Sequence, residues 1–359
     1  MKQILFSAAL CMGGLLIGLH NQTLAVSALA YVNSLKVLQE SSSVTSKSQL
    51  HNRAKLITVK VLFPENGSWG SGILIQRQGS VYTVLTNAHV VRGEGSYTIE
   101  PHNGQKYNAQ KLAVGSLFNG DDLALLQFES TQNYPIASLK AISGLQEGDK
   151  VFAVGYPYQP ESENNGKFSL VPGQISFLGL EQPLMGGYKV GTSNDFLKGM
   201  SGGALLNPQG EVVGVNGMHK HLFGTCPYRY ENGSPVDCSK LPQELPRSWT
   251  IPIEKVVEQA PCKLDISLVN PNPSPDFHWF EGLKESSTAA GLLESAAQSP
   301  EQWELIVCHR EKAIEQMQAV PSTSNFYARA QNQIAQYKED LNYAQLQLEK
   351  LKREEAARQ

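Results

Sequence analysis

Short apolar runs separated by turn residues dominate the chain from Lys55 to Ile253. Residues 55–62 alternate apolar and polar positions in places, as a half-buried strand does. Asn-Gly pairs, which are typical of tight turns, lie at Asn66-Gly67, Asn103-Gly104, Asn119-Gly120 and Asn232-Gly233. No part of this region shows a long helical period. The pattern predicts an all-β barrel or sandwich domain, and about 200 residues are enough for two small barrels.

The composition changes after residue 261. Residues 270–275 alternate Pro with Asn and Ser, which is typical of a rigid, extended segment, so we assign 261–298 to a Pro-rich linker. The sequence Ser299-Pro300-Glu301-Gln302 then combines a capping serine, a proline at the first helical position and a glutamine three residues after the serine. A helix is expected from about Pro300 to Gln318.

The last segment carries apolar residues at alternating spacings of three and four. They are Tyr327, Ala330, Ile334, Tyr337, Leu341, Ala344, Leu348 and Leu351. This spacing predicts a heptad seam, with Glu, Lys, Gln and Arg at the other positions. Residues 299–359 are therefore expected to form a helical hairpin or a coiled-coil tail. Two uses of the seam stay open, which are packing within the chain and self-association or docking of another protein.

The first 30 residues have the pattern of a targeting segment. Lys2 precedes the apolar stretch Ile4–Leu19, and Ala28-Leu29-Ala30 matches an A-x-A cleavage site. Residues 1–30 are therefore expected to be a secretory signal peptide, followed by an N-terminal segment over 31–54. A membrane anchor is the alternative, although the stretch is slightly short for a span. Cleavage near Ala30 would make the mature protein secreted or periplasmic.

Charge excludes some classes of partner. The net charge is −3, and no block of basic residues is present. Nothing in the sequence therefore suggests binding to nucleic acid or to an anionic membrane surface. No cofactor and no metal are expected.

Four cysteines follow the expected signal peptide, namely Cys226, Cys238, Cys262 and Cys308. An even number suits disulfides in an oxidising compartment. A bond between Cys226 and Cys238 would close a polar loop, and one between Cys262 and Cys308 would tie the tail to the barrels. Zinc is the alternative, with His219, His221, Cys226 and Cys238 as ligands, but the paired spacing of a zinc ribbon is missing.

Three polar residues stand at the ends of apolar strands in an order that suits nucleophilic catalysis. Ser201 lies within Gly199–Ala204, where glycines allow close approach of substrate. His89 follows a β-branched strand, and Asp122 heads an apolar one. A histidine can act as the base for a serine, and a carboxylate can orient that histidine. Taken singly, each residue also fits an ordinary core, turn or loop role.

These motifs resemble the three signatures of trypsin-like serine peptidases, in the bacterial branch of HtrA-type proteases and glutamyl endopeptidases. The matching runs are Thr86-Asn87-Ala88-His89-Val90-Val91, Asp122-Leu123-Ala124-Leu125-Leu126 and Gly199-Met200-Ser201-Gly202-Gly203. The resemblance implies a mainly β fold of two six-stranded antiparallel Greek-key β-barrels, with the site between them, followed by the helical tail. The peptidase domain would cover 55–260, with barrel one over about 55–142 and barrel two over about 143–260.

The resemblance also implies a role for each residue. His89 would be the general base, Asp122 its orienting acid and Ser201 the nucleophile. The backbone N–H groups of Gly199 and Ser201 would form the oxyanion hole. Asp121 is the competing acid, but the family pattern has the carboxylate directly before Leu-Ala, which selects Asp122. The reaction implied is hydrolysis of peptide bonds in polypeptide substrates through an acyl-enzyme.

Two residues are candidates for substrate selection. Asp195 lies six residues before Ser201, where trypsin-like enzymes carry the acid that selects Arg or Lys. It can equally be a loop acid capped by its neighbours. Asn216 lies where glutamyl endopeptidases carry a histidine, which argues against selection of Glu.

The region after the barrels departs from many HtrA-type proteins, because no PDZ-like, strand-rich domain is expected there. Regulation by bound peptide C-termini is therefore not carried over. The alternative function is a non-proteolytic, exported binding or chaperone-like module on a protease scaffold, with the helical tail as its working part.

Overall fold

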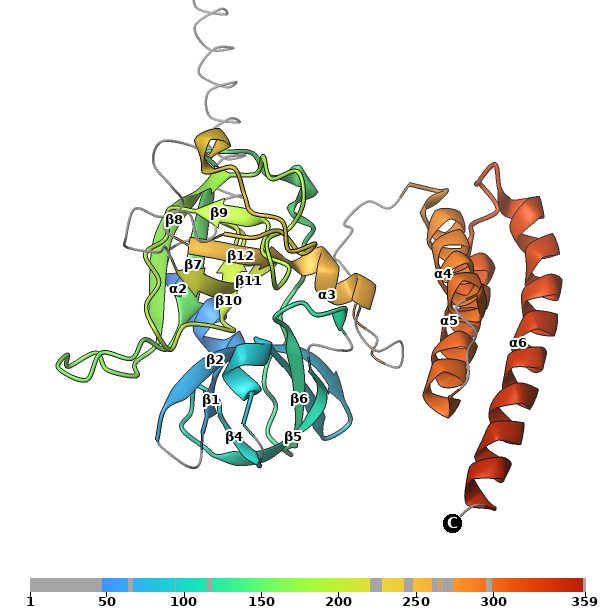
Figure 1. The fold of residues 1–359 in the computed structure, drawn as a ribbon, viewed down its shortest axis with the longest axis horizontal. Coiled ribbons are helices and arrows are strands. Elements are labelled where there is room, and N and C mark those ends of the chain that lie inside the picture. Colours follow the sequence, from blue (N-terminus) through green and yellow to red (C-terminus); the bar gives the residue numbers. More distant parts are fainter. Residues whose placement is uncertain are drawn as a thin grey trace, which may run out of the picture.

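The computed structural model describes residues 47–63, 67–93, 95–114, 118–219, 228–241, 248–259, 264, 266, 274–294 and 299–357. Two β-barrels are followed by three long helices (Figure 1). The expected signal peptide and residues 31–46 lie outside the described residues, as do residues 270–273 of the expected linker.

Six antiparallel strands close the first barrel in the order β1-β2-β3-β6-β5-β4. Their bounds are β1 Thr58–Leu62, β2 Trp69–Gln78, β3 Val81–Thr86, β4 Tyr97–Glu100, β5 Tyr107–Val114 and β6 Ala124–Glu129. Val59 and Val61 on β1 are fully buried, while Lys60 between them is partly exposed. The alternation that predicted a strand here thus fills the barrel interior.

The second barrel also has six antiparallel strands, in the order β10-β11-β12-β9-β8-β7. Their bounds are β7 Lys150–Gly155, β8 Ser169–Phe177, β9 Val190–Thr192, β10 Ala204–Leu206, β11 Val212–His219 and β12 Ser248–Pro252. Short 3₁₀ turns accompany the barrels in the described ranges, among them η1 Ala88–Val91, η3 Ile142–Gly144 and η4 Cys238–Lys240. The predicted fold class of two six-stranded antiparallel barrels is confirmed.

One apolar cluster joins the two barrels. It includes Ile73 and Leu85 from the first barrel, and Val154 and Val215 from the second. All four side chains are fully buried. Burying such side chains is the main force that holds two barrels together, at roughly 1.5–3 kcal/mol for each fully buried side chain.

The helix α2 (Lys47–Ile57) precedes β1, and this corrects one expectation. Residues 55–57 were expected to begin a strand, but they form the last turn of this helix. Leu50, Ala54 and Ile57 are buried on one face of α2, within the cluster that joins the barrels. Four apolar residues in eleven are too weak a pattern to stand out beside the strong β signal of β1.

A second correction concerns the assigned linker 261–298. The short helix α3 (Ile253–Gln259) follows β12, and α4 (Phe277–Glu294) lies inside the range assigned to the linker. Trp279, Gly282 and Ala289 are the buried residues of α4. The proline-rich composition just before α4 concealed a helix whose stability comes from packing against its neighbours.

Helices α5 (Pro300–Ala319) and α6 (Tyr327–Ala356) complete a three-helix bundle with α4. Figure 1 shows α4, α5 and α6 side by side. The predicted helix start is confirmed, because the Ser299 side chain caps the Gln302 backbone N–H and the Gln302 side chain caps that of Ser299. Ala330, Tyr337 and Ala344 of the heptad seam are buried in the bundle core. The seam thus packs within the chain.

Two of the four cysteines fall on described residues. Cys238 and Cys308 are disulfide-bonded. Cys226 and Cys262 lie outside the described residues, so the pairing stays a prediction. A disulfide-bonded Cys238 has no thiolate to offer a zinc ion, and His221, another ligand of the zinc alternative, also lies outside the described residues. In the ranges given above, no helix is long and apolar enough to cross a membrane.

The helical bundle encloses a polar network. Glu285 on α4 accepts a hydrogen bond from Nδ1 of His309 on α5 over 2.6 Å. The neighbouring Arg310 donates to Ser286 on α4 and pairs with Asp340 on α6. Burial alone would raise the pKa of the Glu285 carboxyl, but the hydrogen bond and the charge of His309 outweigh it and lower that pKa. The network thus connects all three helices.

We expect Glu285→Gln to destabilise the protein at neutral pH by about 1 kcal/mol. Because the pKa of Glu285 is lower in the folded state, its carboxylate stabilises the fold above the usual pKa of 4.5. That contribution is lost as the pH falls through the lowered pKa, so the difference from the wild-type protein should shrink in acid. Urea unfolding followed by tryptophan fluorescence at neutral and acidic pH tests this. Glu281→Gln, at a more exposed position on α4, is the control and should change little.

Candidate active site

Strand pairing brings His89 and Asp122 together. Strand β3 pairs with β6 so that Thr86 lies opposite Ala124. His89 follows β3 on the 3₁₀ turn η1, and Asp122 lies two residues before the start of β6. The buried Asn87 side chain ties the two segments by donating to the Asp122 carbonyl over 2.8 Å. The apolar runs recognised in the sequence are thus the strands that place both polar residues.

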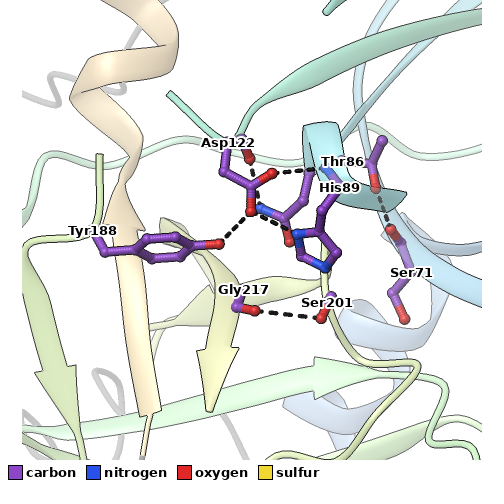
Figure 2. A network of polar contacts seen from close by, with 8 residues as sticks. Ser71, Thr86, His89, Asp122, Tyr188, Ser201 and Gly217 are labelled. Atoms are coloured by element: carbon purple, nitrogen blue, oxygen red, sulfur yellow. Dashed lines mark hydrogen bonds and ion pairs between the residues drawn. The ribbon is translucent and has the colours of Figure 1, made fainter. Parts of the chain in front are cut away.

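The Asp122 carboxylate holds His89 at two points (Figure 2). Its Oδ2 lies 2.6 Å from His89 Nδ1, and its Oδ1 accepts the His89 backbone N–H over 2.7 Å. With Nδ1 donating to the carboxylate, Nε2 is the nitrogen with a free lone pair. Figure 2 shows that the ring edge opposite Asp122 faces Ser201. The pair therefore presents a basic nitrogen toward the serine.

Ser201 lies on the turn before β10 and is 8% exposed. Both barrels hold this turn. Ser71 on β2 donates its backbone N–H to the Ser201 carbonyl over 2.8 Å, and Gly202 donates to the Asn216 carbonyl over 2.8 Å. The Ser201 hydroxyl makes a long hydrogen bond of 3.5 Å to the Gly217 carbonyl. No hydrogen bond joins it to His89 among the described residues, so the hydroxyl would rotate toward the imidazole to transfer its proton.

The backbone of Gly199 is fixed on both sides. The Lys198 carbonyl accepts from the Tyr158 N–H over 2.7 Å, and the Gly199 carbonyl accepts from the Ser71 hydroxyl over 2.8 Å. In a trans peptide the N–H points away from the carbonyl, so the Gly199 N–H faces away from Tyr158. Within the described ranges, neither Gly199 N–H nor Ser201 N–H has an acceptor. Both N–H groups are therefore available as donors, and their role as an oxyanion hole stays a prediction.

The position of Gly199 demands a glycine for two reasons. Its φ is +89°, which L side chains rarely adopt. A Cβ there would also lie 2.6 Å from the Tyr156 carbonyl oxygen. The next residue, Met200, is fully buried in the core of the second barrel. The loop that carries Gly199 and Met200 is therefore held in place by packing as well as by hydrogen bonds.

Comparison with known proteins agrees with this geometry. Residues 70–215 match the family model described as a trypsin-like peptidase domain. A relative named serine protease Do-like HtrA, from Bacillus subtilis, is 30% identical over 162 residues, which is 43% of this chain and 34% of that protein. A probable periplasmic serine endoprotease, DegP-like, from Chlamydia pneumoniae is 34% identical over 149 residues, covering 41% of this chain and 28% of that protein.

Within the two barrels, the chain is therefore similar to trypsin-like peptidase domains and to HtrA and DegP-like serine proteases. The matched part of the chain spans about a third of the length of these relatives. Among solved structures, the serine endoprotease from Yersinia pestis is similar with a TM-score of 0.43 and 25% identity, covering 60% of this chain and 65% of that chain.

The two barrels separate the neighbouring acids Asp121 and Asp122. Asp122 faces His89, whereas Asp121 is buried and pairs with Lys255 of α3 over 3.0 Å. Burial raises the pKa of the Asp121 carboxyl, and the hydrogen bond and charge of Lys255 offset only part of this effect. The arrangement supports Asp122 as the acid that orients the histidine.

The second barrel places the two specificity candidates differently. Asp195 is exposed on the loop between β9 and Gly199. Asn216 is fully buried, and its side-chain amide donates to the Ala204 carbonyl over 2.8 Å. The Asn216 side chain is thus engaged inside the barrel. The expectation that Asn216 contacts substrate stays a prediction that this placement does not favour.

Sequence reasoning missed two residues that border the site. Tyr188, just before β9, donates its hydroxyl to the Asp122 carboxylate. His219, at the end of β11, packs its ring on Phe196 with centroids 4.5 Å apart, and burial lowers its pKa. The sequence marked His219 only as a ligand of the zinc alternative and did not mark Tyr188, because only the folding of barrel two brings them near His89 and Asp122.

A matched pair of glycine substitutions tests how tightly the loop that carries Gly199 is packed. Gly199 and Gly233 both have positive φ, +89° and +81° respectively, but a Cβ at Gly233 would meet nothing within 4 Å. We expect Gly233→Ala to cost about 1–2 kcal/mol of unfolding free energy from its backbone conformation alone. Gly199→Ala should cost clearly more, because its methyl collides with the Tyr156 carbonyl. Equal losses in urea denaturation would contradict the tight packing described here.

Proposed function

We propose that the protein is an exported serine endopeptidase that hydrolyses peptide bonds through His89, Asp122 and Ser201. The observation that carries the proposal is the two-point contact between Asp122 and His89, with the free edge of the ring facing Ser201. The relatives support the same activity, because their names describe them as serine proteases or endoproteases. They are similar to this chain over the barrels.

The proposed reaction proceeds in two halves. His89 Nε2 takes the hydroxyl proton of Ser201 while Ser201 Oγ attacks the peptide carbonyl carbon. The resulting oxyanion accepts hydrogen bonds from the N–H groups of Gly199 and Ser201. His89 then donates the proton to the leaving amine as the C–N bond breaks, which leaves an acyl-enzyme. Water, deprotonated by His89, attacks the ester, and the proton returns to Ser201 as the acid product leaves.

Asp122 keeps its negative charge throughout this cycle. Its role is to hold His89 in the tautomer with a basic Nε2 and to stabilise the imidazolium that forms in each half-reaction. The Asp121 carboxylate is paired with Lys255, so we assign it no role in the reaction.

Export and polypeptide substrates belong to the same proposal. The A-x-A site at Ala28–Ala30 and the apolar run before it support a signal peptide. The disulfide-bonded Cys238 and Cys308 suit a secreted or periplasmic protein, because disulfides persist in oxidising compartments. One relative is described as periplasmic. The proposed disulfide pairings remain Cys226 with Cys238 and Cys262 with Cys308.

Substrate selection through Asp195 is a narrower proposal. Its exposed carboxylate would form an ion pair with a Lys or Arg side chain of the substrate. The Asp195 charge also interacts with His219, which follows Gly217 and Met218 on the strand beside Ser201. This interaction supports a position of the carboxylate near the part of the strand that follows Asn216.

Removal of the nucleophile is the first test of the proposed activity. Mature protein beginning at Tyr31 should cleave unfolded casein, and Ser201→Ala should reduce the rate by about 10⁵-fold or more. Mass spectrometry of the new termini would identify the bonds cleaved. Folded wild-type protein that leaves casein and varied peptide libraries intact would favour the alternative of a binding module.

The Asp195 proposal is tested separately with peptides that carry Lys, Glu or Val before the scissile bond. We expect the wild-type protein to favour Lys, and Asp195→Asn to lose about tenfold of that preference because an exposed charge pair is weak. Ser193→Ala, a change on the same loop that keeps the charge, is the control. A preference for Val that Asp195→Asn leaves unaltered would show that Asp195 is an ordinary loop acid.

A further inference from the structure

The triad acid is held by a turn of the second barrel as well as by its own barrel. Residues 184–188 form a tight turn closed by Leu184 and Tyr188, whose backbones pair. The Asp122 backbone N–H donates to the Gly186 carbonyl over 2.9 Å. The Tyr188 hydroxyl donates to Asp122 Oδ2 over 2.5 Å, the same oxygen that His89 Nδ1 contacts. The turn is thus hydrogen-bonded to both the backbone and the carboxylate of Asp122. Figure 2 shows the contact between Tyr188 and the carboxylate.

We propose that Tyr188 is a positioning residue, whose hydroxyl orients the Asp122 carboxylate toward His89 and sets how strongly that carboxylate attracts the imidazole proton. This proposal rests on the proposed peptidase function. It adds a residue from the second barrel to a pair that the first barrel alone supplies.

The direction of the hydrogen bond is set by the surroundings of Tyr188. The side chain is 4% exposed. Burial raises the pKa of the phenol well above its ordinary value, and the charge of Asp122 and the hydrogen bond to it raise it further. The hydroxyl therefore keeps its proton at all pH values at which the enzyme would work. A protonated phenol beside a carboxylate acts as the donor.

The space for this hydroxyl is reserved by a glycine. A Cβ on Gly217 would lie 2.1 Å from the Tyr188 oxygen, so no larger residue fits there without moving the ring. Gly217 is also the residue whose carbonyl accepts the Ser201 hydroxyl. Tyr188 therefore lies between the acid and the strand beside the nucleophile. Its position depends on the docking of the two barrels.

Other charged groups near this site must be considered in any pH dependence. They are Asp121 with its partners Lys255 and Glu231, Arg92 whose charge acts on Tyr188, and His219 whose charge interacts with that of His89. None of them is altered by removing the Tyr188 hydroxyl. A change of the pH profile on that removal can therefore be assigned to the Asp122–His89 pair.

Tyr188→Phe tests the proposal through kinetics. We expect kcat to fall by about 10- to 100-fold with little change in KM, because the Asp122 carboxylate loses the contact that orients it toward His89 and no substrate contact is touched. Without the donor, Asp122 becomes a stronger acceptor and stabilises the imidazolium more. The acidic limb of the kcat/KM profile should therefore move up by about half a pH unit. An unmoved limb would overturn the proposal.

Tyr82→Phe is the matched control, since it removes another buried tyrosine hydroxyl. Tyr82 lies in the first barrel, and its hydroxyl contacts the backbones of Gln132 and Tyr134. We expect it to lower the melting temperature and leave the pH limb in place. If both variants moved the limb equally, the effect would be one of stability and the proposal would fall.

A readout independent of activity separates this proposal from the proposed function. In a Ser201→Ala background, NMR titration of histidines, assigned with His89→Gln, should show the His89 midpoint moving to higher pH in Tyr188→Phe. If Tyr188→Phe fails to fold, 3-fluorotyrosine at position 188 keeps the ring and strengthens the donor, and should move the midpoint down. If the His89 midpoint shifts but the protein with an intact Ser201 shows no protease activity, only the peptidase function is refuted. An unshifted midpoint in an active protease would refute only the role of Tyr188.

Discussion

The Asp122 carboxylate is the group on which the geometry of the site depends. A charge that is largely removed from water must be met by hydrogen bonds, or its burial costs several kcal/mol. Here the donors come from two directions, with His89 from the first barrel and Tyr188 from the second. The carboxylate is fully satisfied only when η1, the start of β6 and the turn 184–188 are all in place. Correct docking of the barrels and correct orientation of His89 are therefore one event.

The placement of Ser201, the proposed nucleophile, depends on the same docking of the barrels. Ser71 of the first barrel binds the Ser201 carbonyl through its N–H and the Gly199 carbonyl through its hydroxyl. The apolar cluster shared by the barrels supplies the free energy, while these hydrogen bonds set the geometry. The left-handed backbone at Gly199 then leaves two N–H groups without acceptors in the described part of the chain. Such a pair of donors suits an anion that forms only during reaction.

The local pattern of apolar runs predicted an all-β domain, and the resemblance carried by three short motifs implied the two barrels and the candidate triad. A run of β-branched residues ending at His89, an acid before Leu-Ala and a glycine-flanked serine each carry their meaning within a few residues. The helix start at Ser299 was predictable for the same reason, since both halves of its capping box lie within four residues. Tyr188 could not be found this way. Its meaning comes from a contact with Asp122, 66 positions away in the sequence.

The missed helices have a related cause. In α2 and α4, burial against distant segments stabilises short or proline-flanked sequences whose own pattern is weak. The specificity candidates show a second limit of prediction from sequence, because a matching position in the chain does not establish a side chain's surroundings. Asp195 and Asn216 occupy positions suggested by resemblance, yet one side chain is exposed and the other is engaged in the barrel core. Local motifs place the reacting groups, while the surroundings that select a substrate depend on loops with no such motif.

The most direct test of the central claim is the rate at which a fluorophosphonate probe labels Ser201, measured by intact-protein mass spectrometry. The probe needs an activated serine and an oxyanion hole but no particular peptide sequence. We expect rapid labelling of the wild-type protein, a similar rate for Asp121→Asn, and a rate about 10³- to 10⁴-fold lower for Asp122→Asn. Folded wild-type protein that is not labelled, or an Asp122→Asn variant labelled as fast as the wild type, would contradict the claim that Asp122 and His89 activate Ser201.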